Sequence, residues 1–325
     1  MMIAKLLPRL GALGVAAGLA ALAAAAGEKM TTYTYKQVGS LAIKADVYEP
    51  DGFAGPRPVL VWIHGGALMS GSRELEPDHR LKRSMLADGA VVVSIDYRLA
   101  PETKLPAIIT DVEDAFRWIR EQGPGLFRAD PERIVVAGSS AGGYLTLVAG
   151  YRIHPRPRAL VSYWGYGDLI GAWYSEPSRW PRHQKLFLTR ETAYSLVSGP
   201  PVANKADRPG EGGANFYMYC RQQGIWPREA TGWDPKREPE KFYPYMPLRN
   251  VTPDYPPTLL IHGLKDTDVP AENSRLMAAE FRRQGVEHRL ITDPEADHGS
   301  FWSPEARAAI DAAALEFFRA HLAPR

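Results

Sequence analysis

Residues 135–144 read VVAGSSAGGY, a β-branched run followed by two serines between glycines. Within it, Gly138-Ser139-Ser140-Ala141-Gly142 matches the pattern G-x-S-x-G in one register only, and that register selects Ser140. The serine of this pattern sits on a sharp turn that joins a buried strand to a helix. The stretch therefore predicts a strand over 133–139, a strained turn at Ser140 and a helix over 141–151.

A phosphate-binding loop is the competing interpretation of the same glycines. Its spacing, G-x-x-x-x-G, spans Gly138 to Gly143, but the next residue is Tyr144, where that loop needs a lysine. The sequence excludes this interpretation, and Ser140 becomes a candidate nucleophile.

Buried strands and helices alternate on both sides of this turn. Segments such as PVLVWIHGG (58–66) and AVVVSIDY (90–97) are almost continuously apolar, as expected of strands covered on both faces. Their alternation with helical patterns predicts right-handed crossovers and a mostly parallel sheet of about eight strands, with helices on both faces. The predicted strands are 32–38 and 40–50 (a hairpin around Gly39-Ser40), 58–66, 90–97, 133–139, 158–164, 257–263 and 286–292, and the predicted helices are 79–88, 107–122, 141–151, 271–284 and 304–322.

A long segment, residues 165–255, interrupts this alternation after the sixth strand. It is rich in tryptophan, tyrosine and proline and has little clean periodicity. A structureless loop of this length would be unusual in a compact domain, so we expect an ordered, cap-like insertion. Because it leaves from the carboxyl end of a strand, we expect it to cover a site there, and a packing subdomain without ligand contact is the alternative.

The N-terminus has a different composition from the rest of the chain. Lys5 and Arg9 precede the apolar, alanine-rich run 10–26, which ends in small residues of A-x-A type. This is the layout of a secretory signal peptide, and the run is shorter than the ~20 residues that a membrane anchor needs. We therefore expect residues 1–26 to be a cleaved signal, 27–325 to be one α/β domain without a stable membrane span, and the protein to be secreted or periplasmic.

Charge and cysteine content exclude several classes of protein. The formal net charge is only +2, and no long basic run supports nucleic-acid binding. The single cysteine, Cys220, allows no intramolecular disulfide and lies among aromatic residues, which favours a buried apolar role. No Cys/His pair has metal-site spacing, so we expect neither a metal nor an organic cofactor.

A serine hydroxyl needs a base to act as a nucleophile. His298 lies in DPEADHGSFW, in the loop between the last predicted strand and the last helix, on the same edge of the sheet as Ser140. His64 and His262 each end a strand and precede glycine, where a histidine more often holds loop backbone by hydrogen bonds. We therefore predict His298 as the base.

The acid that orients this histidine is expected in the loop HGLKDTDVP after the penultimate strand. Asp266 and Asp268 both qualify, and we favour Asp266 because the H-G-x-x-D spacing places it on the turn nearest the strand end. For the oxyanion, the loop HGGA at 64–67 offers the N–H groups of Gly65 and Gly66, and Ala141 offers the N–H after the nucleophile.

These motifs together resemble the α/β-hydrolase superfamily, and particularly its hormone-sensitive-lipase-like carboxylesterases. The resemblance runs from about residue 40 to the C-terminus outside the insertion, and its order Ser140, Asp266, His298 is that of the superfamily. Two positions depart from the pattern: Ala67 replaces the usual fourth glycine, and Ser139 stands where relatives usually carry an acid. The motifs are HGGA, DYRLAPE, GSSAGG, HGLKDTDVP and DHGSFW.

The resemblance implies a serine hydrolase that cleaves small-molecule carboxylic esters of short to medium acyl chains, and the N-terminal signal implies that it is exported. In DYRLAPE, we expect Arg98 and Glu102 to form structural ion pairs. Three alternatives stay open. They are a peptidase of the prolyl-oligopeptidase type, an acetyl-polysaccharide esterase whose insertion aromatics stack on sugars, and a binding protein on an inactive hydrolase scaffold.

Overall fold

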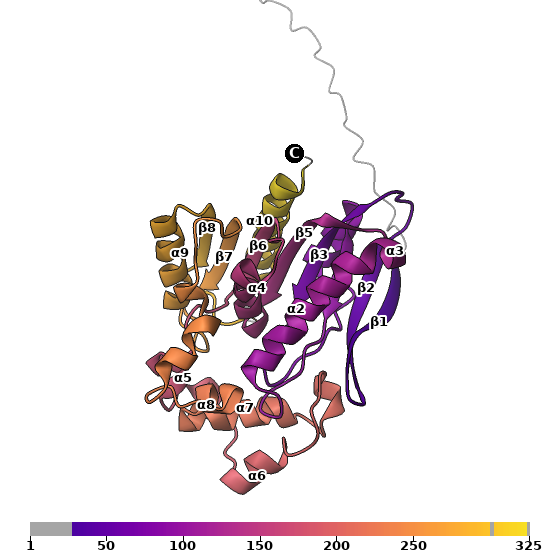
Figure 1. The fold of residues 1–325 in the computed structure, drawn as a ribbon. Coiled ribbons are helices and arrows are strands. Elements are labelled where there is room, and N and C mark those ends of the chain that lie inside the picture. Colours follow the sequence, from indigo (N-terminus) through magenta and orange to yellow (C-terminus); the bar gives the residue numbers. More distant parts are fainter. Residues whose placement is uncertain (1–27, 300–301, 324–325) are drawn as a thin grey trace, which may run out of the picture.

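The computed structural model describes residues 28–299 and 302–323, which form an eight-stranded sheet covered by helices (Figure 1). The strand order is β1-β2-β4-β3-β5-β6-β7-β8. β2 runs antiparallel to β1 and β4, and every other neighbouring pair is parallel. The strands are β1 (Glu28–Val38), β2 (Leu41–Pro50), β3 (Arg57–Ile63), β4 (Val91–Ile95), β5 (Ala129–Ser139), β6 (Ala159–Tyr163), β7 (Thr258–Gly263) and β8 (His288–Asp293).

The predicted α/β class, strand number and mostly parallel sheet are confirmed. The predicted hairpin corresponds to β1 and β2, with Gly39 in the left-handed conformation (φ 59°) at its turn. The strand predicted over 58–66 is shorter in the structure, because β3 ends at Ile63. The glycines after His64 therefore belong to a loop. The helices that connect the strands are α1 (Arg80–Ala87), α2 (Leu105–Glu121), α3 (Gly123–Phe127), α4 (Ala141–Arg152), α9 (Glu272–Gln284) and α10 (Pro304–Leu322).

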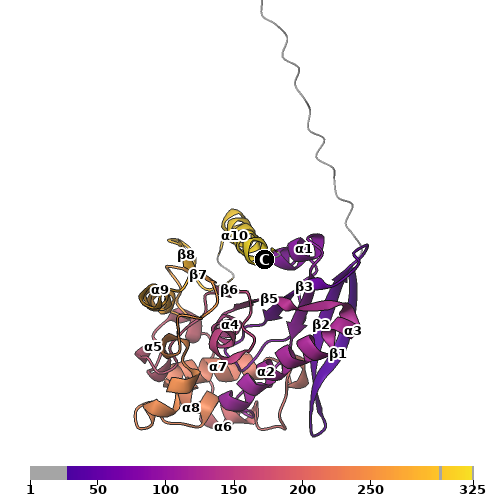
Figure 2. The same cartoon turned by 45° about the horizontal axis from the view of Figure 1, so that its top comes forward.

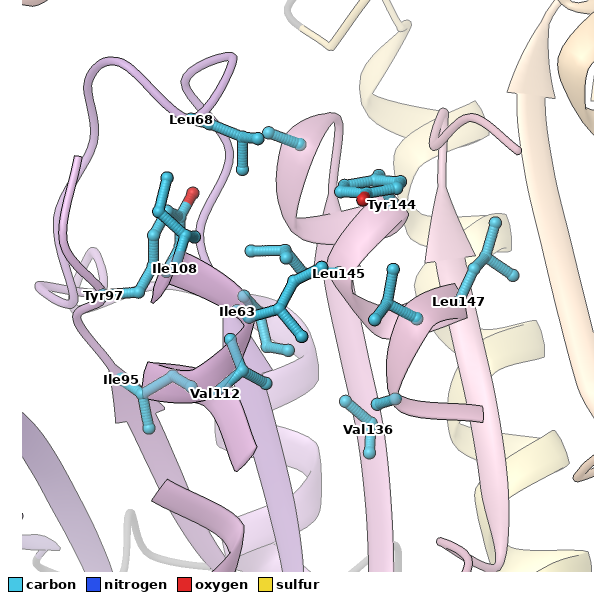
Figure 3. Packing of buried hydrophobic residues seen from close by; sticks show 14 of the residues in the cluster. Ile63, Leu68, Ile95, Tyr97, Ile108, Val112, Val136, Tyr144, Leu145 and Leu147 are labelled. Atoms are coloured by element: carbon cyan, nitrogen blue, oxygen red, sulfur yellow. The ribbon is translucent and has the colours of Figure 1, made fainter. Parts of the chain in front are cut away.

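Helices cover both faces of the sheet. In Figure 2, α1 and α10 lie together on one side, and α2 and α4 lie on the other. Alternate side chains of each strand serve the two faces. Val135 packs in the cluster that contains α1 and α10, and Val136 packs in the cluster that contains α2 and α4. Figure 3 shows this second cluster, where Leu145 of α4 lies over the strands.

The segment between β6 and β7 is folded and contains four helices and five short 3-10 turns. Figure 1 shows α5 to α8 gathered at one end of the sheet. The sequence predicts none of these helices and turns. In α7, for example, two glycines at the start and a buried charged residue, Arg221, obscure the helical periodicity. They are α5 (Ala172–Ser175), α6 (Arg190–Ser195), α7 (Gly212–Gln223), α8 (Trp226–Thr231), η1 (Pro181–His183), η2 (Lys205–Asp207), η3 (Pro239–Lys241), η4 (Tyr243–Tyr245) and η5 (Pro247–Arg249).

Aromatic side chains build the core of this insertion. Trp226 is fully buried and stacks on Tyr174 with ring centroids 3.9 Å apart, and Trp233 packs edge-on against Phe242. Cys220 is buried as expected, and burial raises the pKa of its thiol well above the usual value.

The predicted signal peptide, residues 1–26, lies outside the described residues. Across 28–299 and 302–323, no helix is both long enough and apolar enough to span a membrane.

Candidate active site

Ser140 occupies a strained turn between β5 and α4. Its backbone has φ 56° and ψ −119°, a conformation that L-residues rarely adopt, and it caps the first turn of α4. The neighbouring glycines are required by close packing. A Cβ at Gly142 would lie 2.0 Å from the carbonyl oxygen of Ile63, and one at Gly138 would lie 2.4 Å from that of Gly142. The chain can therefore hold the serine at this sharp bend only with glycine on both sides.

Replacing Gly142 with alanine is expected to destabilise the fold. The new methyl group would collide with backbone of β3, which cannot move without breaking the sheet, and we expect a loss of about 3 kcal/mol. Urea unfolding of Gly142→Ala measures this loss. Gly125→Ala is the matched control, because a Cβ there meets nothing within 4 Å, and its stability should change by about 0.5 kcal/mol or less. Equal midpoints for the two variants would contradict the packing argument.

The structure brings Ser140, His298 and Asp266 together, although 126 and 32 residues separate them along the chain. His298 Nε2 lies 3.0 Å from Ser140 Oγ, and His298 Nδ1 lies 2.7 Å from Asp266 Oδ2. Because an ionised carboxylate can only accept, the Nδ1–H group donates a hydrogen bond to Asp266, and Nε2 is left to accept one from the serine hydroxyl. The meeting follows from parallel strands, since Ser140 follows β5, Asp266 follows β7 and His298 follows β8.

Asp266 is buried and held in place by the loop that carries it. Its Oδ1 accepts hydrogen bonds from the N–H groups of Asp268 and Val269, both at 2.8 Å. Burial alone would raise the pKa of Asp266, but hydrogen bonds from His262 and His298 outweigh it and lower the pKa to about 2. Asp266 is therefore negatively charged at neutral pH.

The pKa of His298 is raised above its ordinary value of 6.5. Burial acts to lower it, but the hydrogen bond to Asp266 and the negative charges of Asp268 and Asp266 act more strongly, and nearby Arg182 opposes them. A raised pKa strengthens the imidazole as a base and favours its protonated form when it has taken a proton.

His64 and His262 hold backbone, as their positions had suggested. His64 is buried and stacks on Tyr97 with centroids 4.2 Å apart, and burial lowers its pKa to about 4. His262 Nε2 lies 3.0 Å from the carbonyl oxygen of Val269 and 3.3 Å from Asp266 Oδ2, and its Nδ1 lies 2.7 Å from Ser274 Oγ. Among the described residues, the ring that contacts Ser140 Oγ is that of His298.

The glycines after β3 lie directly beside the serine. A Cβ at Gly65 would come within 3.2 Å of Ser140 Cβ, so the Gly65 backbone borders the nucleophile. Gly66 has φ 103°, and Ala67 keeps a positive φ of 55° although it is not a glycine. Within the described part of the chain, no hydrogen bond engages the N–H groups of Gly65, Gly66 and Ala141.

The two charged residues of DYRLAPE form structural ion pairs, as expected. Arg98 contacts Asp111 at 2.7 Å, and Glu102 pairs with Arg208, a residue of the insertion. Arg208 also donates to the carbonyl oxygen of Met69, in the loop after β3. The pair therefore ties the insertion to the loop that carries Gly65 and Gly66.

Residues of the insertion that were not predicted from the sequence contact the loop that carries Asp266 and the loop that carries His298. Arg182 of η1 lies 3.2 Å from Asp297, whose carboxylate also accepts from the N–H groups of Thr267 and His298, both at 2.7 Å. No motif or periodicity marks Arg182 in the sequence, and Asp297, although it begins the DHGSFW motif, was given no role there. The one available signal is adjacency, since Asp297 directly precedes His298.

Asp268 is the second place where the insertion meets the site. Its Oδ1 accepts hydrogen bonds from Tyr217 (2.5 Å) and Arg221 (2.8 Å) of α7 and lies 3.0 Å from His183 Nε2. Asp268 thus contacts the insertion, whereas Asp266 contacts the Nδ1 side of His298.

Two family models match the chain, one in each half. The model of the alpha/beta hydrolase fold matches residues 60–209, and that of the prolyl oligopeptidase family matches residues 213–325. The first contains the loop after β3 and Ser140, and the second contains Asp266 and His298. The border between them falls inside the insertion.

Known proteins show the same likeness. Esterase LipC from Mycobacterium tuberculosis is 30% identical over 81% of the chain, and the chain spans 58% of the length of that esterase. A non-reducing polyketide synthase from Penicillium brevicompactum, mapC', is 27% identical over 90% of the chain, which spans only 16% of that synthase. The structure of a hyperthermophilic esterase from Pyrobaculum calidifontis superposes with a TM-score of 0.62 at 26% identity, covering 91% of this chain and 87% of that one.

Proposed function

The chain belongs to the α/β-hydrolase superfamily, within its carboxylesterase-like group, and we propose that it is a serine esterase that cleaves small carboxylic esters. The observation that carries the proposal is the unbroken path of contacts from Asp266 through His298 to Ser140. The esterase names of LipC and the Pyrobaculum calidifontis protein support it.

The proposed reaction has two halves that use the same groups. Ser140 Oγ attacks the ester carbonyl carbon while His298 Nε2 takes the hydroxyl proton, and the carbonyl electrons move to the oxygen, which accepts from the N–H groups of Gly65, Gly66 and Ala141. When the C–O bond to the alcohol breaks, Nε2 returns its proton to the leaving oxygen. Water, deprotonated by His298, then attacks the acyl-serine, and Ser140 leaves with the proton.

Covalent labelling tests this proposal most directly. A fluorophosphonate probe should label the wild-type protein, and mass spectrometry of the peptides should place the label on Ser140. p-Nitrophenyl esters of increasing acyl length then test the proposed preference for short to medium chains. A protein that neither takes the label nor hydrolyses these esters would be the inactive scaffold considered above.

We expect kcat/KM to fall as the pH decreases, with the midpoint of this fall above 6.5, the ordinary pKa of histidine. Only neutral His298 can take the serine proton, so activity is lost as the pH falls through its raised pKa. Asp268→Asn removes a charge that raises this pKa and should move the acid limb of kcat/KM to lower pH. Arg182→Ala removes an opposing charge and should move the limb to higher pH. Shifts of the same sign in both variants would contradict this assignment.

Export is part of the proposal and rests on the charged, then apolar, then small-residue order of residues 1–26. The mass of the mature N-terminus, measured on protein expressed with its full leader, tests it. Loss of about 26 residues supports a cleaved signal, and an intact leader in the membrane fraction would indicate an anchor.

A peptidase is the second candidate, favoured by the match of residues 213–325 to the prolyl oligopeptidase family. Peptide p-nitroanilides, assayed beside p-nitrophenyl esters, distinguish the two. Stacking of sugars on the aromatic residues of the insertion has less support, because Trp226 is fully buried. Trp180, which is 47% exposed, is the tryptophan that could still contact a sugar. Acetate release from acetylated xylan tests that activity.

A further inference from the structure

Two carboxylates flank the imidazole of His298, one beside each ring nitrogen. Asp266 Oδ2 lies 2.7 Å from Nδ1, and Asp268 Oδ2 lies 3.8 Å from Nε2. Nε2 is the nitrogen that faces Ser140, so Asp268 stands on the side where a substrate must react. Asp266 orients the imidazole of His298 through Nδ1, whereas Asp268 has no role in the proposed reaction.

The two oxygens of Asp268 differ in their surroundings. Oδ1 is held by Tyr217, Arg221 and His183, all from the insertion. Among the described residues, no hydrogen bond reaches Oδ2, whose charged neighbours are His298 Nε2 at 3.8 Å and Arg182 Nη2 at 3.9 Å. The carboxylate is thus fixed in orientation by one oxygen and presents the other to the reactive side of the histidine.

Asp268 keeps its negative charge although only 9% of its surface is exposed. Burial alone would raise its pKa, but the hydrogen bond with His183 and the charges of His298 and Arg221 outweigh it, so the pKa of Asp268 lies well below its usual range. Arg221 is itself buried, with its guanidinium 5.0 Å from the ring centre of Tyr174. A fixed, charged acceptor with a free oxygen strongly favours a hydrogen-bond donor beside it.

We propose that Asp268 Oδ2 is a specificity-determining acceptor for the leaving alcohol, and that it selects esters whose alcohol carries a second hydroxyl near the ester oxygen. This inference rests on the proposed function, in which the leaving oxygen approaches Nε2 to receive its proton. Substituents on that alcohol then lie beside Oδ2. A hydroxyl there donates to the carboxylate, whereas an alkyl group displaces water from a charged oxygen and offers no hydrogen bond in return. The favoured substrates are partial esters of polyols and sugars.

A matched pair of esters tests the proposal. 2-Hydroxyethyl butyrate and propyl butyrate share the acyl group and differ by a hydroxyl in place of a methyl. We expect wild-type kcat/KM to favour the hydroxyl ester by about tenfold, the usual value of one hydrogen bond to a charged group. In Asp268→Asn the preference should fall to about twofold or less, because a neutral amide is the weaker partner. Both proteins are assayed above the acid limb of their pH profiles, so that a change in His298 titration does not enter the ratio.

Tyr217→Phe is the matched control, since it removes one donor to Oδ1 and leaves the charge and the free Oδ2 in place. It should keep the wild-type preference. A purely structural Asp268 would, when replaced, slow both esters equally and leave the ratio unchanged, and that result would overturn the proposal. So would a wild-type ratio near one, which needs no variant. Failure of the proposed function looks different: neither ester is turned over, and the fluorophosphonate probe does not react.

Discussion

Ser140→Ala is expected to lower kcat/KM for p-nitrophenyl butyrate by about five to six orders of magnitude, the loss typical of removing a nucleophile that acts as a unit with its base. The substitution removes only the Oγ that contacts His298 Nε2 at 3.0 Å. The fold should be unaffected, because alanine at 140 adds no atoms to the strained turn and the Ser140 N–H still bonds to the carbonyl oxygen of Tyr163. Steady-state kinetics, with probe titration to exclude wild-type contamination, measures the loss.

Two further variants sharpen this result. Ser139→Ala is the neighbouring control and should retain both turnover and probe labelling, because the G-x-S-x-G register excludes Ser139 as the nucleophile. The double variant Ser140→Ala, His298→Ala should be no slower than either single variant, since the base has no task without the hydroxyl. Additive losses in the double variant, or a label that moves to Ser139, would mean that a different group attacks the ester.

Asp266→Asn is expected to lower kcat by about four orders of magnitude with little change in the fold. The amide oxygen can still accept from the N–H groups of Asp268 and Val269, which preserves the loop. Its NH₂ group, however, faces His298 Nδ1 and favours the tautomer with the proton on Nε2. That tautomer cannot take the proton of Ser140. Turnover of p-nitrophenyl butyrate measures the loss, and near-UV circular dichroism checks the packing.

Asp268→Asn is the natural comparison, because it makes the same chemical change two residues away. Asp268 lies on the Nε2 side and leaves the tautomer unaffected, so its effect on the p-nitrophenyl ester should be far smaller. The reverse order of the two variants would show that Asp268, and not Asp266, orients the histidine.

The central fold and the main residues of the site could be predicted because they depend on local patterns. Apolar runs mark β3 to β7, and the glycines around Ser140 mark a bend whose packing the structure explains. Parallel strands end at one edge of the sheet, so motifs that follow different strands were expected to meet. The H-G-x-x-D spacing separated Asp266 from Asp268 for the same reason, since it measures the distance from the end of β7.

The contacts from the insertion could not be predicted in the same way. Arg182, His183 and Arg221 reach the site through short helices and turns whose order carries no regular period. Arg221 would be assigned to the surface by its charge, but it is buried among aromatic rings and beside Asp268. Such contacts depend on how the insertion folds back on the sheet, and a single sequence contains no local signal for that.

The attachment of the insertion to both the Asp266 loop and the His298 loop bears on how α/β-hydrolases with such an insertion can be redesigned. Exchanging residues 165–255 for the corresponding region of a related esterase would leave Asp268 and Asp297 without Arg221, His183 and Arg182. A graft intended to alter selectivity would then also disturb the reacting groups. A working hybrid therefore needs the residues that correspond to Asp268 and Asp297 to be taken from the same protein as the new insertion.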